Sequence, residues 1–71
     1  MSEDIKIGDH VQVFLNSKTW NSEGWFDGTV VRIDPYSEHR SFYWVELDEY
    51  ASSLLNIRQI SVFNPKNIRK V

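Results

Sequence analysis

The two histidines are the first residues to consider for chemistry, because a histidine side chain changes charge near neutral pH and also binds metals. Each stands beside a carboxylate: Asp9 precedes His10, and Glu38 precedes His39. An acid–base pair or a metal site needs both side chains on one side of the backbone, whereas adjacent residues of a strand point to opposite faces. We place His10 in a strand and His39 in a loop, and we interpret both as surface polar residues.

Three carboxylates close together, Glu46, Asp48 and Glu49, are the second candidate for chemistry. A calcium site needs a loop that presents oxygen ligands at regular spacing, and no such loop accompanies these residues. Hydrolysis by a carboxylate pair needs a cleft that fixes their separation, and a domain of 71 residues is too small for a deep cleft. We therefore expect a solvated acidic face, no enzyme activity, no metal and no cofactor.

Aromatic side chains make up 14% of the chain and give the clearest indication of a binding function. In so small a domain, large rings are expected to supply much of the buried area. Rings that gather on a surface instead bind cations, as in methyl-lysine cages, or proline-rich peptides, as in SH3 grooves. The rings expected near loops at one end are Trp20, Trp25, Tyr36, Trp44 and Tyr50. We expect Trp25 and Tyr50 to be packed, so the predicted partner-binding residues are Trp20, Tyr36 and Trp44.

A basic stretch near the C-terminus favours a second kind of partner. Its members, which have no acidic residue among them, are Arg58, Lys66, Arg69 and Lys70. Such side chains contact phosphates, and nearby rings stack on bases. The formal net charge of −2 gives the chain no overall attraction for a polyanion, so nucleic-acid contact must depend on this local patch. We therefore predict protein docking, with RNA, DNA or peptide binding as the alternative.

Short strands must position these residues. Residues 10–15 alternate between polar and apolar side chains, which predicts a strand with its aliphatic residues inward. Residues 24–34 are rich in β-branched and aromatic residues and predict a long, bent central strand. Gly28 in its interior predicts a bulge or a close approach of another backbone. The residues expected to face inward from the first strand are Val11, Val13 and Leu15.

A turn and a third strand follow. Residues 34–41 contain a proline and several turn-forming residues, which predicts a chain reversal. Residues 42–48 alternate again, and their charged side chains identify the outer face. This parity predicts that Trp44 is largely exposed, while the residues expected inward are Tyr43, Val45 and Leu47. Residues 49–56 are expected to form a turn or loop, with Leu54 or Leu55 closing one end of the fold.

The last third of the chain completes the predicted sheet. Residues 57–63 indicate a fourth strand with Ile60 and Val62 inward. Asparagine before proline predicts one 3₁₀ turn over residues 65–67, and residues 68–71 form the last strand. This layout is that of an all-β, SH3-like, five-stranded small barrel with one 3₁₀ turn before the last strand. We expect a disordered tail over residues 1–4 and one domain over residues 5–71.

The composition also predicts where the protein works. No cysteine is present, which excludes disulfides, thiolate zinc sites and cysteine nucleophiles. No apolar run is long enough for a membrane helix, and the first residues lack the regions of a signal peptide. We therefore expect a cytoplasmic monomer without membrane insertion, either free or peripheral to a membrane complex.

Several short segments resemble small barrels of the electron-transport accessory type. These segments are residues 8–13, Trp20, residues 28–34, residues 43–47 and residues 63–71. They are most similar to photosystem I reaction-centre subunit IV, and more loosely to the ferredoxin–thioredoxin reductase variable chain, a ferredoxin-docking dehydrogenase subunit and Tudor-like barrels. The resemblance implies a non-catalytic docking or assembly subunit of an electron-transfer complex.

The chain departs from that family at one informative position. In the family, basic residues help to seat an acidic electron carrier, and a Val-Arg-Phe-like segment carries one of them. The corresponding segment here is Val45, Glu46 and Leu47, so a carboxylate stands where a positive charge would meet the carrier. Like charges at a contact disfavour association. The resemblance therefore implies the fold and a general docking role, and it assigns no site residue.

Overall fold

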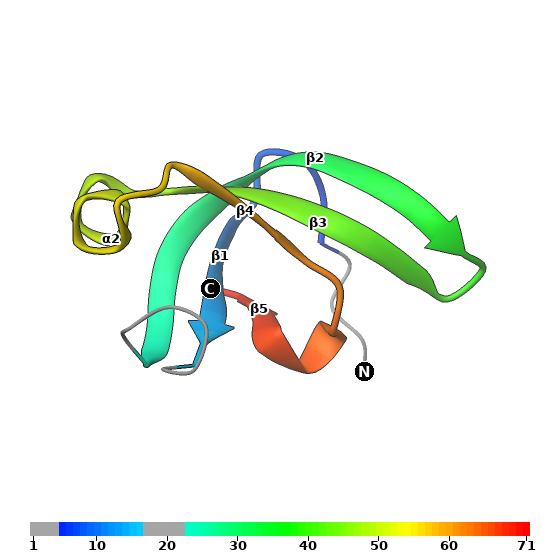
Figure 1. Cartoon of the computed structure of the whole chain (residues 1–71). Helices are drawn as coiled ribbons and strands as arrows, with labels where there is room; N and C mark the ends of the chain where they lie inside the picture. The colour runs from blue at the N-terminus through cyan, green and yellow to red at the C-terminus, as the bar shows by residue number, and fades with distance from the viewer. Residues whose placement is uncertain (1–4, 17–22) are drawn as a thin grey trace.

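The computed structural model describes residues 5–16 and 23–71. Its five antiparallel strands form one sheet in the order β4-β3-β2-β1-β5 (Figure 1). The strands are β1 (His10–Leu15), β2 (Gly24–Ser37), β3 (Arg40–Leu47), β4 (Gln59–Val62) and β5 (Ile68–Lys70). The helical elements are α2 (Glu49–Leu55), between β3 and β4, and η1 (Pro65–Asn67), a 3₁₀ turn before β5.

The predicted all-β class is confirmed in its main feature, the antiparallel sheet. Closure into a barrel would require β4 and β5, which lie at the two ends of the strand order, to pair with each other. Within the described residues, no ladder joins these two strands. The sheet is therefore open, although β2 curves strongly along its length (Figure 1).

β2 is the central strand, as predicted, and its 14 residues pair with β1 in the first half and with β3 in the second. The register with β3 shifts at Val31 and again at Tyr36, so the irregularities lie there and not at Gly28. Gly28 fulfils the other prediction, close approach: a Cβ at this position would lie 2.5 Å from Val45 Cγ1 and 2.8 Å from the Glu46 carbonyl oxygen. Only glycine fits between the two strands at this point.

The turn predicted over residues 34–41 is much shorter in the structure. β2 and β3 are joined by Glu38 and His39 alone, and Pro35 lies within β2, opposite Ser41. In this half of β2, the described chain pairs with it only on the β3 side. Proline is tolerated in a strand whose other side is an edge, because no ladder hydrogen bond is lost there.

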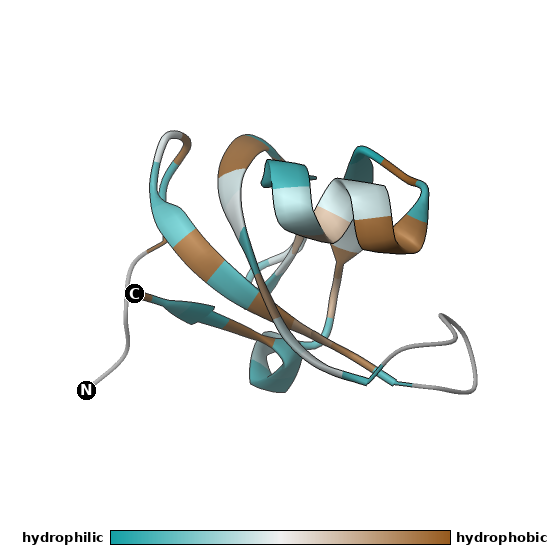
Figure 2. Ribbon diagram, turned by 90° about the vertical axis from the view of Figure 1, so that its left-hand side faces the viewer, coloured by the Kyte–Doolittle hydropathy of each residue, from teal (hydrophilic) through white to brown (hydrophobic). Residues whose placement is uncertain are grey.

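The core is aliphatic and lies on the inner face of the sheet, and Figure 2 shows the matching alternation of hydrophilic and hydrophobic residues along the strands. The predicted inward residues of β1 and β4 are confirmed, as are those of β3 apart from the half-buried Tyr43. Among the described residues, Phe26 is the one ring that is fully buried, and the other buried rings are only half-buried, so the centre of the core is aliphatic. The buried residues are Val11, Val13, Leu15, Phe26, Val30, Val45, Leu47, Ala51, Ile60, Val62 and Ile68.

Residues 49–56 form α2 and its C-cap instead of the predicted turn or loop. Asp48 begins the helix, and its carboxylate accepts a hydrogen bond of 2.8 Å from a backbone N–H of the first turn. Asn56 ends it in the left-handed conformation at φ 58°. Of the two leucines expected to close an end of the fold, Leu55 packs against the core, whereas Leu54 is 49% exposed.

The predicted 3₁₀ turn is confirmed over Pro65–Asn67. The Asn64 side chain caps it by accepting a hydrogen bond of 2.9 Å from the Lys66 N–H, and the following Ile68 is buried at the start of β5. No helix in the described part of the chain is long and apolar enough to span a membrane.

Candidate functional site

The outer face of the sheet carries two of the three predicted partner-binding residues. Along β3, Phe42 and Trp44 alternate with the buried Val45 and Leu47, so their side chains point away from the core. The face extends across the neighbouring strands, because Trp44 lies opposite a residue of β2 on one side and Ser61 of β4 on the other.

Three rings from three segments meet on this face. Tyr36 packs edge-on against Phe42, with ring centroids 5.9 Å apart, and against Phe63, at 5.4 Å. Phe42 and Phe63 lie closer still, at 4.7 Å. The Arg40 guanidinium stands 5.4 Å from the centroid of the Phe63 ring. Tyr36 nevertheless exposes 69% of its surface, so the cluster is held by its own members and remains open to solvent.

Trp44 is half-buried, not largely exposed as predicted. Its indole Nε1 donates a hydrogen bond of 3.1 Å to Asp34 Oδ2, and Arg32 Nε donates one of 2.8 Å to Asp34 Oδ1. The ring also borders a shallow hollow shared with Val31 and Gln59. Strands on both sides of β3 supply these neighbours, which explains why strand parity alone overestimated the exposure of Trp44.

We define the outer aromatic face as Tyr36, Phe42, Trp44 and Phe63. The sequence predicted Tyr36 and Trp44 but missed Phe42 and Phe63. Phe42 has the same strand parity as Trp44, which was a usable signal. Phe63 was harder to find, because its place depends on the register between β3 and β4. The third predicted ring, Trp20, lies outside the described residues.

The predicted basic stretch does not form one patch. Arg58 precedes β4 and Lys66 follows it, so the whole strand separates them. Arg69 is engaged by the protein itself: its guanidinium lies 3.9 Å from the centroid of the Trp25 ring, and its Nε donates a hydrogen bond of 2.9 Å to Gln12 Oε1. These contacts hold the guanidinium against the protein and occupy its Nε donor.

Lys70 is likewise placed beside a carboxylate, with its Nζ 3.5 Å from Asp9 Oδ2. The same oxygen of Asp9 accepts a hydrogen bond of 2.8 Å from the Lys6 backbone N–H. This hydrogen bond, with a smaller contribution from the positive charge of Lys70, lowers the pKa of Asp9 below its ordinary value. The contact between Asp9 and Lys70 joins the start of β1 to β5, and it offers no reactive group.

Two rings expected to be packed are exposed. Trp25 is 36% exposed on the outer side of β2, where it lies between Arg69 and Phe14. Tyr50 is 71% exposed on α2. Both errors have one origin, because the aliphatic residues of the strands fill the core without them.

The residues considered for catalysis are not assembled into a site. His10 and His39 are both exposed, and His39 Nε2 lies 4.0 Å from Glu38 Oε1 at the turn between β2 and β3. Among residues 5–16 and 23–71, no group of three histidine or acidic side chains is placed to hold a metal ion.

Comparisons with family models, with curated proteins and with solved structures found no match for this chain. The function must therefore be inferred from the chemistry of its surfaces.

Proposed function

We propose that this protein is a non-catalytic, SH3-like docking module that binds another protein through the outer aromatic face. The observation that carries the proposal is the cluster of three rings, Tyr36, Phe42 and Phe63, on a surface that the core does not use. Trp44 lies on the same side of β3 as Phe42. Protein interfaces are enriched in aromatic residues and arginine, and a few such residues supply most of the binding energy.

The side chains of this face are already held in place before a partner arrives. The hydrogen bond to Asp34 fixes the Trp44 ring, and the edge-on contacts with Phe42 and Phe63 fix Tyr36. A partner therefore pays little conformational entropy to order them. Arg40 beside the rings adds a donor at the margin of the face.

Charge supports a protein partner over a nucleic acid. Glu46 extends from the same side of β3 as Trp44 and would repel phosphates. Two of the four predicted nucleic-acid contacts, Arg69 and Lys70, are beside protein groups that satisfy or neutralise them.

We place the partner in an electron-transfer complex, as the family resemblance implies, with the module acting as a cytoplasmic monomer or at the periphery of a membrane complex. Glu46 on the outer side disfavours a strongly acidic carrier as the direct contact. The partner surface expected here is apolar and neutral to basic.

Site-specific photo-cross-linking tests this function. Benzoylphenylalanine in place of Tyr36 is expected to cross-link to one protein in the source cells, and an excess of the unmodified chain should compete. The matched control places the same group at Ile7, which is 64% exposed and lies before β1. Products containing nucleic acid, a second copy of the chain, or the same products from both positions would contradict the proposal.

A further inference from the structure

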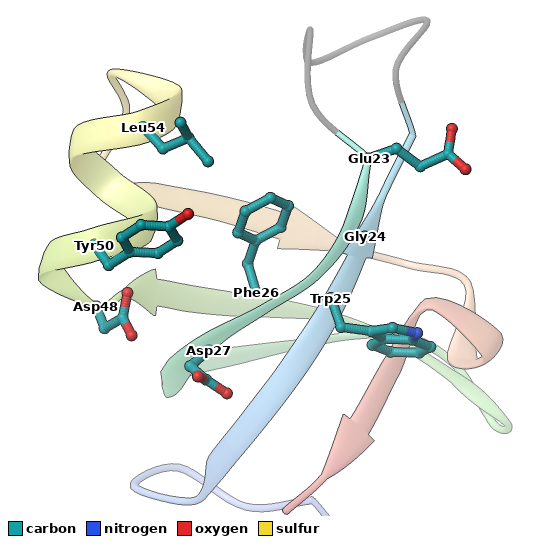
Figure 3. A pocket seen from close by; sticks show the side chains of 8 residues that line it. All are labelled: Glu23, Gly24, Trp25, Phe26, Asp27, Asp48, Tyr50 and Leu54. Atoms are coloured by element: carbon teal, nitrogen blue, oxygen red, sulfur yellow. The ribbon is translucent and has the colours of Figure 1, made fainter.

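A second surface, the groove between α2 and β2, offers different chemistry from the outer aromatic face (Figure 3). Its volume is about 410 Å³. Phe26 forms the floor, and Tyr50 and Leu54 stand along the helix side. These two residues are one helical turn apart, and they expose 71% and 49% of their surfaces. The groove therefore presents an apolar stripe to solvent.

Two carboxylates stand at one end of this stripe. Figure 3 shows Asp27 and Asp48 below the Tyr50 ring, whereas the side chains of Glu23 and Trp25 point away from the helix. The backbone N–H of Asp48 donates a hydrogen bond of 3.1 Å to the Asp27 carbonyl oxygen, which ties the start of the helix to β2. The start of α2 is thus held against β2 at this end of the groove.

Each carboxylate has a neutral donor that orients it. Asp27 Oδ1 accepts a hydrogen bond of 3.0 Å from Gln12 Nε2, and Asp48 Oδ1 accepts one of 2.8 Å from the Ala51 N–H. Among the described residues, neither has a lysine or arginine within ion-pair distance. The end of the groove therefore carries negative charge that the described chain does not neutralise, and Glu49 on the first turn of α2 adds to it.

We infer that this groove binds a lysine- or arginine-bearing peptide segment of another protein. The aliphatic stem of such a side chain lies along Phe26 and Leu54, and its cationic head reaches Asp27 and Asp48 beside the Tyr50 ring. The negative charge of the groove is complementary to a basic peptide segment. The same carboxylates would repel nucleic acids and anionic membranes. The groove binds independently of the outer aromatic face.

Peptide titration of the full-length chain, followed by amide chemical shifts, tests the inference. The probes are two eight-residue peptides of alternating leucine and charged residues, one with lysine and the other with glutamate. The lysine peptide is expected to shift amides of Phe26, Tyr50 and Leu54, and its affinity should fall steeply with added salt. The glutamate peptide should leave these amides unshifted.

Three variants locate the contact. Tyr50→Ala removes the exposed ring, and Asp48→Asn removes a charge while keeping a good N-cap for α2, so both should fold. Each is expected to weaken binding of the lysine peptide about tenfold. Ile7→Ala is the control, because Ile7 is 64% exposed and does not line the groove. It should leave this affinity unchanged.

Four results would overturn the inference. The first is the absence of binding at about 1 mM lysine peptide. The second is equal binding of both peptides, and the third is unchanged affinity in Tyr50→Ala and Asp48→Asn. The fourth is dimerisation of the free chain, measured by sedimentation equilibrium, that Tyr50→Ala abolishes, because the occupant would then be a second copy. None of these results bears on the cross-linking from Tyr36, so the two proposals fail separately.

Discussion

The inner and outer faces of the sheet differ in residue type as well as in exposure. The side chains most fully buried on the inner face are valines, and Phe26 is the single ring of the described chain that joins the core. The outer face of the same strands carries Phe42, Trp44 and Tyr36. Rings would bury more area per residue than valines. A chain of 71 residues that leaves most of its rings outside the core indicates that folding depends on one face and recognition on the other.

The largest effect on stability is expected on the inner face. Val45→Ala should lower the free energy of unfolding by about 1–3 kcal/mol, because it removes buried methyl groups and leaves a cavity. Urea denaturation measures the change. Val31→Ala, at an exposed position of the neighbouring strand, is the control and should change stability by less than about 0.5 kcal/mol. Equal effects at the two positions would show that the faces are assigned wrongly.

The outer face should show the opposite behaviour. Tyr36→Ala is expected to weaken partner binding by about 2 kcal/mol, or roughly thirtyfold, while the free energy of unfolding falls by less than half of that. Calorimetric titration with the cross-linked partner and urea denaturation of the same variant give the two numbers. A stable variant with full affinity would remove Tyr36 from the interface.

Substitution of Trp44 should have an effect on stability between those of Val45 and Tyr36, because Trp44 is half-buried and hydrogen-bonded. Trp44→Phe keeps most of the ring but removes the donor to Asp34, and it is expected to cost about 1 kcal/mol of stability. A double-mutant cycle with Asp34→Ala, which removes the acceptor, isolates this hydrogen bond. Additive effects in that cycle would mean that the indole N–H contributes nothing through Asp34.

The smallest effect concerns acid stability at the exposed end of β1. The lowered pKa of Asp9 means that its stabilising contribution is present above the ordinary value of 3.8 and is lost as pH falls through the folded-state value. Asp9→Asn should therefore lose slightly less stability than the wild type between about pH 4 and pH 2. Urea denaturation at several pH values measures this difference. If the free energy of unfolding fell equally with pH in the variant and the wild type, the prediction would be contradicted.

The sequence predicted the strands well because alternation requires only local information. The inward positions of β1 and β4 and the cap of the 3₁₀ turn at Asn64 are of this kind. The far half of β2 was predicted less well: the strand continues to Ser37 instead of ending at Asp34, so the turn after it was predicted too long. Its register shifts also depend on the pairing with β3, which no local pattern specifies. The short helix was missed although Asp48 and Asn56 both mark its ends.

The candidate site was only half predictable. Its rings are brought together by the register between strands, as with Phe42 and Phe63, and register is set by contacts across the whole sheet. The exposure of Tyr50 depends on how α2 is seated, which no local pattern specifies. Composition suggested an aromatic core, but valines occupy its centre, and of the described rings Phe26 alone is fully buried there.

From Phe42 towards the turn, the hairpin of β2 and β3 is a two-stranded ribbon in the described chain. β1 pairs with β2 only as far as Thr29, and the last residue of β3 that pairs with β4 in this direction is Tyr43. Such ribbons are marginally stable alone. The contacts of Phe63 with Tyr36 and Phe42 tie the ribbon to the rest of the protein. Amide hydrogens of the ribbon should therefore exchange faster than those of β1, and a partner that covers the rings should slow their exchange. Recognition and local order at this end of the molecule depend on the same rings.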